Sequence, residues 1–250
     1  MNIGKVLMGI GLILIGIAFL TANLTINENY TKKQVYLNKD EIQKIKINVY
    51  DHNIIVEESL TNKISITYYV SKNDLKEYYI KDRQASLISN KRAFNLFNFN
   101  FKNYPVIIKI PKNIVLDIDL RTSNGYISLD NLDFNKTNIK TSNGKIILRD
   151  ITFNNTILKT SNGEINLNNI IGKEINLATS NGRINLNYVD VIRINANTSN
   201  GKIAIDKLKS DDIKLSTSNG SVSGSIIGDE MDYNMSLKTS NGNIYINDKK

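Results

Sequence analysis

Residues 158–167 read Leu-Lys-Thr-Ser-Asn-Gly-Glu-Ile-Asn-Leu, and the central Thr-Ser-Asn-Gly occurs seven times in this chain of 250 residues. The first five intervals between copies are 19 residues long and the last is 22. A fixed period near 20 is typical of a solenoid, whose units bury their apolar faces only by stacking on one another. The copies begin at Thr122, Thr141, Thr160, Thr179, Thr198, Thr217 and Thr239.

The residues around each copy alternate between apolar and polar. Every copy has a β-branched residue two positions after the glycine and an apolar residue two positions before the threonine. A period of two indicates a short strand on each side of the bend. Asn-Gly is also the strongest hairpin signal, so a meander or barrel of hairpins is the alternative fold. The constant period favours equivalent residues stacked about 4.8 Å apart. We therefore predict an all-β fold, a single-stranded parallel β-helix of 19-residue coils.

Each residue of the tetrapeptide has an expected role in the bend. The glycine is expected to take a positive φ, and the asparagine to tolerate a left-handed conformation and to bond to the next asparagine along the axis. Strand parity places the threonine inside and the serine outside. A structural role is the favoured interpretation, and sugar or ice binding by the exposed groups is the alternative. The predicted bend residues are Asn124, Gly125, Asn143, Gly144, Asn162, Gly163, Asn181, Gly182, Asn200, Gly201, Asn219, Gly220, Asn241 and Gly242.

The composition excludes several functional classes. With 41% hydrophobic and 22% charged residues the chain is typical of a folded protein, and without cysteine it can form no disulfide or thiolate zinc site. The single histidine, His52, argues against the usual catalytic triads and against a metal site. No P-loop, Gly-x-Ser-x-Gly or His-Glu-x-x-His motif is present. Paired acids at 211–212 and 229–230 are interpreted as solvated loops. We expect no enzymatic activity, no metal and no cofactor.

The N-terminal stretch predicts a membrane anchor. Residues 6–22 carry no charge, and Lys5 precedes them. The run is at the short end for a spanning helix, and its poor cleavage site favours an uncleaved anchor over a signal peptide. The positive-inside bias of Lys5 places the rest of the chain outside the cytoplasm. We predict a single-pass cell-membrane protein with an anchor at 1–26, an irregular N-terminal β portion at 27–117 and regular solenoid repeats at 118–250.

The N-terminal β portion contains a degenerate coil. Residues 45–56 can be laid on the repeat without a gap, which places His52 at a bend where a positive φ is tolerated. Further strands are expected at 63–70 and 106–110, the second at an edge or at the start of the regular stack. A packed strand is expected to contain Phe94, Phe97, Phe99 and Phe101.

Basic residues gather beside the bends. Of the fourteen positions that directly flank the seven copies, seven are basic and only Glu164 is acidic. Like charges on neighbouring strands cost stability, so a linear anion would relieve their repulsion. The alternative is that lysine is abundant and keeps β edges soluble. The candidate anion-binding column contains Arg121, Lys140, Lys145, Lys159, Arg183, Lys202 and Lys238. The opposite bend is acidic, with Asp130, Asp133, Asp150, Asp190, Asp206 and Asp229.

From residue 40 to the C-terminus the chain resembles the bacterial β-strand-repeat proteins known as putative adhesins. The resemblance rests on the degenerate first coil, the strand ending in Ile110-Pro111 and the short Ser-Asn-Gly bends. It implies a right-handed β-helix with an envelope role, and it brings no catalytic residues. We expect a structural or adhesin-like binding module with three partners to test: the membrane through residues 6–22, an anionic wall polymer or lipid, and a membrane regulator protein. The last would make the protein an accessory of an envelope-stress sensor. Nucleic acid is not expected outside the cell.

Overall fold

A computed structural model describes residues 30–71, 75–89, 104–228 and 233–249. Within these ranges there is no helix with the length and apolar character needed to cross a bilayer. The predicted anchor at 6–22, the phenylalanine run at 94–101 and the acidic pair at 229–230 lie outside the described residues.

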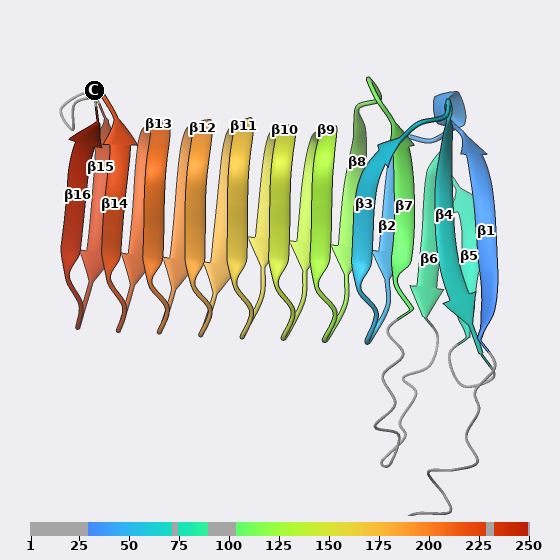
Figure 1. Ribbon diagram of the computed structural model, residues 1–250, viewed down its shortest axis with the longest axis horizontal. Coiled ribbons are helices and arrows are strands. Elements are labelled where there is room, and N and C mark those ends of the chain that lie inside the picture. Colours follow the sequence, from blue (N-terminus) through green and yellow to red (C-terminus); the bar gives the residue numbers. More distant parts are fainter. Residues whose placement is uncertain (1–29, 72–74, 90–103, 229–232, 250) are drawn as a thin grey trace, which may run out of the picture.

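The centre of the molecule is a parallel β-solenoid with a 19-residue register. Its five long strands are β9 (Ile127–Lys140), β10 (Ile146–Lys159), β11 (Ile165–Thr179), β12 (Ile184–Thr198) and β13 (Ile203–Thr217). Ile146 pairs with Ile127 on one side and with Ile165 on the other, each 19 residues away. Figure 1 shows these strands side by side along one axis, each joined to the next by a tight loop along the lower edge. The parallel register confirms the predicted solenoid and rules out the hairpin meander.

The longer, 22-residue interval contains β14 (Val222–Ile227) and β15 (Asn234–Thr239). It is followed by the last strand, β16 (Ile244–Lys249). β15 stacks on the second half of β13, and β16 stacks on β14, all in parallel. The extra residues therefore lie between β14 and β15, and the bend at Thr239 stays in line with the others.

The predicted degenerate coil is confirmed. It is formed by β2 (Lys44–Asn48) and β3 (Ile54–Ser59), which pair in parallel with β8 (Leu116–Arg121) and β9. On their other side β2 and β3 contact β6 (Gln84–Ser89) and β7 (Val106–Pro111), also in parallel. The coil of β6 and β7 therefore lies nearer the N-terminal end of the stack than the coil of β2 and β3, although it comes later in the chain. The predicted strand at 106–110 is neither an edge nor the start of the regular stack, because it lies between β3 and β4.

Antiparallel strands cover the N-terminal end of the stack. β1 (Thr31–Asn38) pairs with β4 (Lys63–Val70), β4 pairs with β7, and β5 (Lys76–Lys81) pairs with β6. A single 3-10 turn, η1 (Lys39–Glu41), joins β1 to β2 within the described residues. The cap satisfies the backbone groups of the first coil, which would otherwise form an open edge.

The core consists of stacked apolar side chains from both halves of each coil. Ile184 is fully buried, as its predicted inward parity requires. Its neighbour Asn185 is only half-buried, and its amide donates to Asn166 Oδ1 at 2.6 Å. An outward-facing residue of this solenoid therefore still bonds to its equivalent in the next coil.

The glycines of the bends are required for close approach and not for a positive φ. Among the described residues, the glycines with positive φ are Gly224 and Gly228, and neither belongs to a Thr-Ser-Asn-Gly copy. A Cβ on Gly163 would lie 1.8 Å from the carbonyl oxygen of Gly144, so any side chain would collide with the coil below. The expectation of positive φ at Asn-Gly was wrong, and it was equally wrong for His52.

Left-handed residues lie instead at the second bend of each coil, where the long strands turn. Five of them follow one another at the 19-residue interval, with φ between 51° and 58°. These five positions are left out of the strand pairing between neighbouring coils. Each coil therefore has one extra, unpaired residue at this bend, as in a β-bulge. The five residues are Asn131, Asp150, Asn169, Tyr188 and Lys207.

Threonine and asparagine tie each Thr-Ser-Asn-Gly bend to the coil below. The buried Thr160 hydroxyl lies 3.1 Å from the Gly144 carbonyl oxygen, to which it donates, and it accepts from the Gly163 N–H at 3.1 Å. The Asn162 amide donates to Asn143 Oδ1 at 2.7 Å, and the same bond recurs along the row. The inward threonine and the asparagine ladder confirm the predicted roles.

Two buried threonines lack such partners. Thr137 and Thr156 stack in register and are 2% and 1% exposed, and neither hydroxyl has a hydrogen-bond partner among the described residues. A buried hydroxyl without a partner costs about 1–3 kcal/mol.

We expect Thr156→Val to raise the free energy of unfolding by about 1 kcal/mol, measured by urea denaturation. Thr160→Val is the control, because its hydroxyl is bonded and its loss should destabilise. A loss of stability in Thr156→Val would contradict the expectation.

Candidate anion-binding surface

The seven predicted basic residues form two rows, one on each side of the Thr-Ser-Asn-Gly bends. In the row before the bends, Lys140 pairs in register with Arg121 on one side and Lys159 on the other. We call these three residues the first basic row. Beyond Lys159 the row continues through Ala178, Asn197 and Ser216 to Lys238, which is therefore isolated from the other three. The second basic row, after the bends, contains Lys145, Arg183 and Lys202, with Glu164 between the first two.

An open groove of about 470 Å³ runs along the first basic row and spans four coils. Its walls include the three basic side chains and the outward serines Ser142, Ser161 and Ser180. These serines are exposed, and within the described residues their hydroxyls make no hydrogen bond, so they remain available as donors. The groove therefore offers cations and hydroxyl donors in a line with a spacing of about 4.8 Å.

The positive charge of the first basic row is only partly compensated. The Arg121 guanidinium donates to both carboxylate oxygens of Asp119, at 3.1 and 3.3 Å. Lys140 and Lys159 have no carboxylate partner among the described residues. Their adjacent positive charges repel each other, and a bound anion would relieve that repulsion. Asp119 was not predicted as a member of this surface, although its position two residues before Arg121 places both on one strand face.

The second basic row is closer to neutral. Lys145 Nζ lies 3.1 Å from Glu164 Oε2, and this hydrogen bond, together with the nearby charge of Arg183, holds the pKa of the Glu164 carboxyl below its ordinary value. Glu164 therefore stays ionised through neutral and mildly acidic pH and releases Lys145 only as the pH falls through that lowered value. The positive charge of Lys145 is therefore largely compensated by Glu164.

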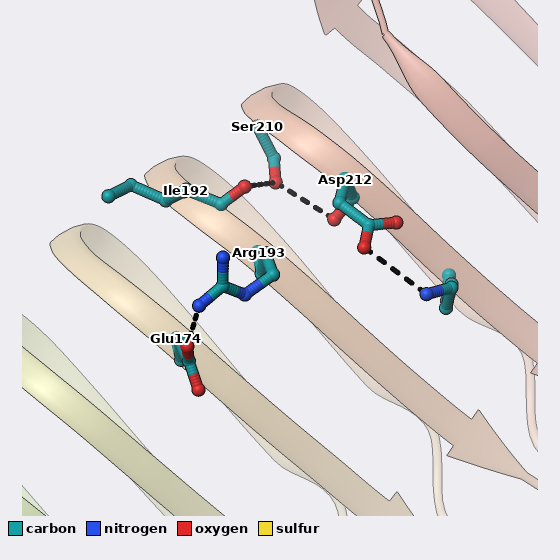
Figure 2. A network of polar contacts seen from close by, with 6 residues as sticks. Glu174, Ile192, Arg193, Ser210 and Asp212 are labelled. Atoms are coloured by element: carbon teal, nitrogen blue, oxygen red, sulfur yellow. Dashed lines mark hydrogen bonds and ion pairs between the residues drawn. The ribbon is translucent and has the colours of Figure 1, made fainter.

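Elsewhere on the solenoid, several stacked charges are paired. Figure 2 shows Arg193 bonded to Glu174 of the preceding coil. Close by, Asp212 forms an ion pair with Lys214 of the same strand. Lys209 pairs with Asp190 at 3.2 Å, also across one coil. Asp212 lies within β13 and not in a solvated loop, which corrects the interpretation of the acidic pair at 211–212. In the first basic row, by contrast, the stacked cations Lys140 and Lys159 have no such partner among the described residues.

The described acidic residues near the second bend do not gather into a cation site. Asp130 is 4.0 Å from Arg149, and Asp150 accepts from the Asn169 amide at 2.5 Å. A cavity of about 260 Å³ lies beside this bend and the 112–114 loop. No group of three or more histidine and acidic side chains with metal-binding geometry exists in the part of the chain that the structure describes.

His52 has a structural environment. Its backbone carbonyl accepts from the Thr122 hydroxyl at 2.9 Å, as a bend glycine does in later coils. Its Nδ1–H donates to the carbonyl oxygen of Tyr104 at 2.9 Å. The histidine therefore connects the row of bends to the N-terminal cap.

Comparisons with known proteins agree with this geometry. Residues 42–250 match the Toastrack family, DUF4097. The chain belongs to this family. No curated protein matches it. Among solved structures, the Toastrack chain is similar to a putative adhesin from Bacteroides fragilis, with 19% identity, a TM-score of 0.61 and coverage of 87% of this chain and 97% of the other.

Two further putative adhesins share the fold of this Toastrack protein. One, from Parabacteroides distasonis, has 14% identity and a TM-score of 0.53 over 88% of this chain and 98% of its own. The other, from Parabacteroides merdae, has 16% identity and a TM-score of 0.50 over 88% and 97%. At these identities the likeness establishes a common fold, an elongated β-solenoid.

Proposed function

We propose that this Toastrack protein is a membrane-anchored, extracytoplasmic binding module of the bacterial envelope, and that its first basic row holds an anionic partner. The observation that carries the proposal is the stacked pair Lys140 and Lys159, which has no carboxylate partner among the described residues, whereas Arg193 and Lys209 each pair with an acid of the neighbouring coil. A phosphate-bearing polymer or surface supplies negative charges in a line, which is the shape of the groove.

Binding is a better account of this surface than catalysis. The described residues that line the groove are lysine, arginine, serine, threonine and alanine, and none of them carries a carboxylate or imidazole that could act as a general acid or base. The structural neighbours described as putative adhesins support an adhesin-like role.

The extracytoplasmic location is supported by the uncharged run at 6–22 after Lys5. Digestion of the solenoid by protease added to intact protoplasts would test that location, and full protection would contradict it.

The anion site is tested with the double variant Lys140→Gln, Lys159→Gln. We expect its affinity for inorganic polyphosphate, measured by titration calorimetry on the full chain in detergent, to fall at least about tenfold, since two cations in the groove are lost. The affinity of the unaltered protein should fall steeply with salt, because exposed charges are screened over about 8 Å at physiological ionic strength. The matched control is Lys136→Gln, Lys173→Gln, which removes the same charge from exposed positions near the second bend.

The variant Glu164→Gln provides the opposite change. It removes the only acid among the flanking positions and releases Lys145, so the affinity for polyphosphate should rise several-fold. If the control loses as much affinity as the groove variant, the binding depends on net charge alone and the proposed site is wrong.

A further inference from the structure

The Thr-Ser-Asn-Gly side of the solenoid is also the side on which the described chain begins. In Figure 1, β1 starts and β4 ends at the lower edge, where the tight loops between the regular coils lie. The contacts agree with the view. The Asn124 amide donates to Asp51, and His52, in the same bend, bonds to Tyr104. The Tyr104 ring lies 4.4 Å from that of Tyr30, the first described residue.

A group of tyrosines marks this point of the cap. The Tyr104 ring also lies 4.7 Å from the ring of Tyr69, so three tyrosines from separate segments meet where the chain enters β1. All three are half-buried and keep part of each ring at the surface. Tyrosine is enriched at membrane–water interfaces, because its ring is apolar and its hydroxyl is polar.

The chain length outside the structure limits how far this edge can be from a bilayer. Seven residues, 23–29, separate the uncharged run at 6–22 from Tyr30. A fully extended chain spans at most about 3.5 Å per residue, so Tyr30, eight positions after residue 22, lies within about 28 Å of the end of that run. The bend side is therefore the side of the solenoid that is held near the membrane surface.

Charge distinguishes the bend side from the opposite side. Next to the bends the first basic row contains two unpaired lysines, and Arg183 and Lys202 follow one another in the second basic row. Near the second bends, by contrast, three basic residues are each paired with an acid of the neighbouring coil, in Arg193–Glu174, Lys209–Asp190 and Arg149–Asp130. The side with uncompensated positive charge thus coincides with the side on which the chain approaches the membrane.

We infer that the solenoid lies flat on the bilayer that its own chain enters, with the Thr-Ser-Asn-Gly side against anionic phospholipid headgroups. This inference rests on the proposed function and names its partner, since the basic rows and the outward serines contact lipid phosphates. A straight row of bends, held in line by the asparagine ladder, provides a surface that can follow a planar membrane over the whole length of the stack. An upright solenoid would place only the cap near the lipid and leave the basic rows unpaired.

Single-cysteine labelling tests this orientation, because the natural chain contains no cysteine. The full chain is reconstituted into phosphatidylcholine vesicles with or without phosphatidylglycerol, and energy transfer is measured from a fluorophore on the protein to a headgroup-labelled lipid. Fluorophores are placed by Ser142→Cys and Ser218→Cys at two exposed bends, and by Thr152→Cys on the opposite side. Four coils separate the two bend positions, a distance of about 19 Å at 4.8 Å per coil.

With phosphatidylglycerol present, we expect equal and strong transfer from the two bend positions and weaker transfer from Thr152→Cys. Added salt, omission of phosphatidylglycerol, or the Lys140→Gln, Lys159→Gln change should reduce the bend signals, whereas Lys136→Gln, Lys173→Gln should not. Much weaker transfer from Ser218→Cys than from Ser142→Cys would show an upright solenoid and overturn the inference. If that result accompanied intact polyphosphate binding by the same protein, the lipid partner would be refuted while the anion site stood. Loss of the polyphosphate site would instead refute the proposed function.

Discussion

Gly163→Ala is expected to lower the free energy of unfolding by about 3–5 kcal/mol, an effect at the upper end for a change of one methyl group. The new Cβ would lie 1.8 Å from the Gly144 carbonyl oxygen and 2.5 Å from its carbon. Both contacts are with backbone, so no side chain can move aside. The coils would have to separate, which breaks the bond from the Thr160 hydroxyl to the same carbonyl. The loss is measured by thermal and urea denaturation followed by circular dichroism.

A second substitution at the same position separates steric from conformational demands. If the glycine were needed for a positive φ, asparagine would be tolerated better than alanine. Close approach predicts that Gly163→Asn is at least as destabilising as Gly163→Ala. Ser161→Ala is the matched control in the same bend, because the serine side chain is exposed, and its effect should stay within about 0.5 kcal/mol. A stable Gly163→Ala variant would contradict the geometry of the bend.

Ile184→Asp is expected to unfold the solenoid or to reduce its stability by several kcal/mol, because it places an unpaired charge in a core position that is 0% exposed. Ile165 and Ile203 stack directly on either side, and neither can solvate a carboxylate. The repeats on both sides depend on this coil for their apolar contacts, so the damage should spread along the stack. Loss of the β signal in circular dichroism at room temperature is the readout.

The control for this variant is Asn195→Asp. Asn195 is exposed and pairs in register with Lys214, so a carboxylate there should change the free energy of unfolding by no more than about 0.5 kcal/mol. It is a better control than Asn185→Asp, because Asn185 donates to Asn166 and its replacement would break a ladder bond. Equal melting temperatures for Ile184→Asp and Asn195→Asp would show that the assignment of inward and outward positions is wrong.

The repeat alone determined the parallel stack, the inward threonine and the asparagine ladder. In a solenoid each coil contacts mainly its neighbours, so a 19-residue period in the sequence is also the distance between residues in contact. The same reasoning found the degenerate coil at 45–56, because its apolar positions coincide with those of later coils. Local pattern and tertiary contact carry the same information in these regions.

Tertiary structure decided the features that depend on contacts outside this period. The coil of β6 and β7 lies beyond β2 and β3 because the chain makes an excursion through the antiparallel cap, and no periodicity encodes that order. The bend glycine is needed because a carbonyl from the coil below approaches it, whereas positive φ occurs at a second bend that has no constant sequence motif. The seven basic residues were predicted together, but the bend turns the chain between them and places them in two rows. Which of their charges remains uncompensated was set by carboxylates that only the fold brings near.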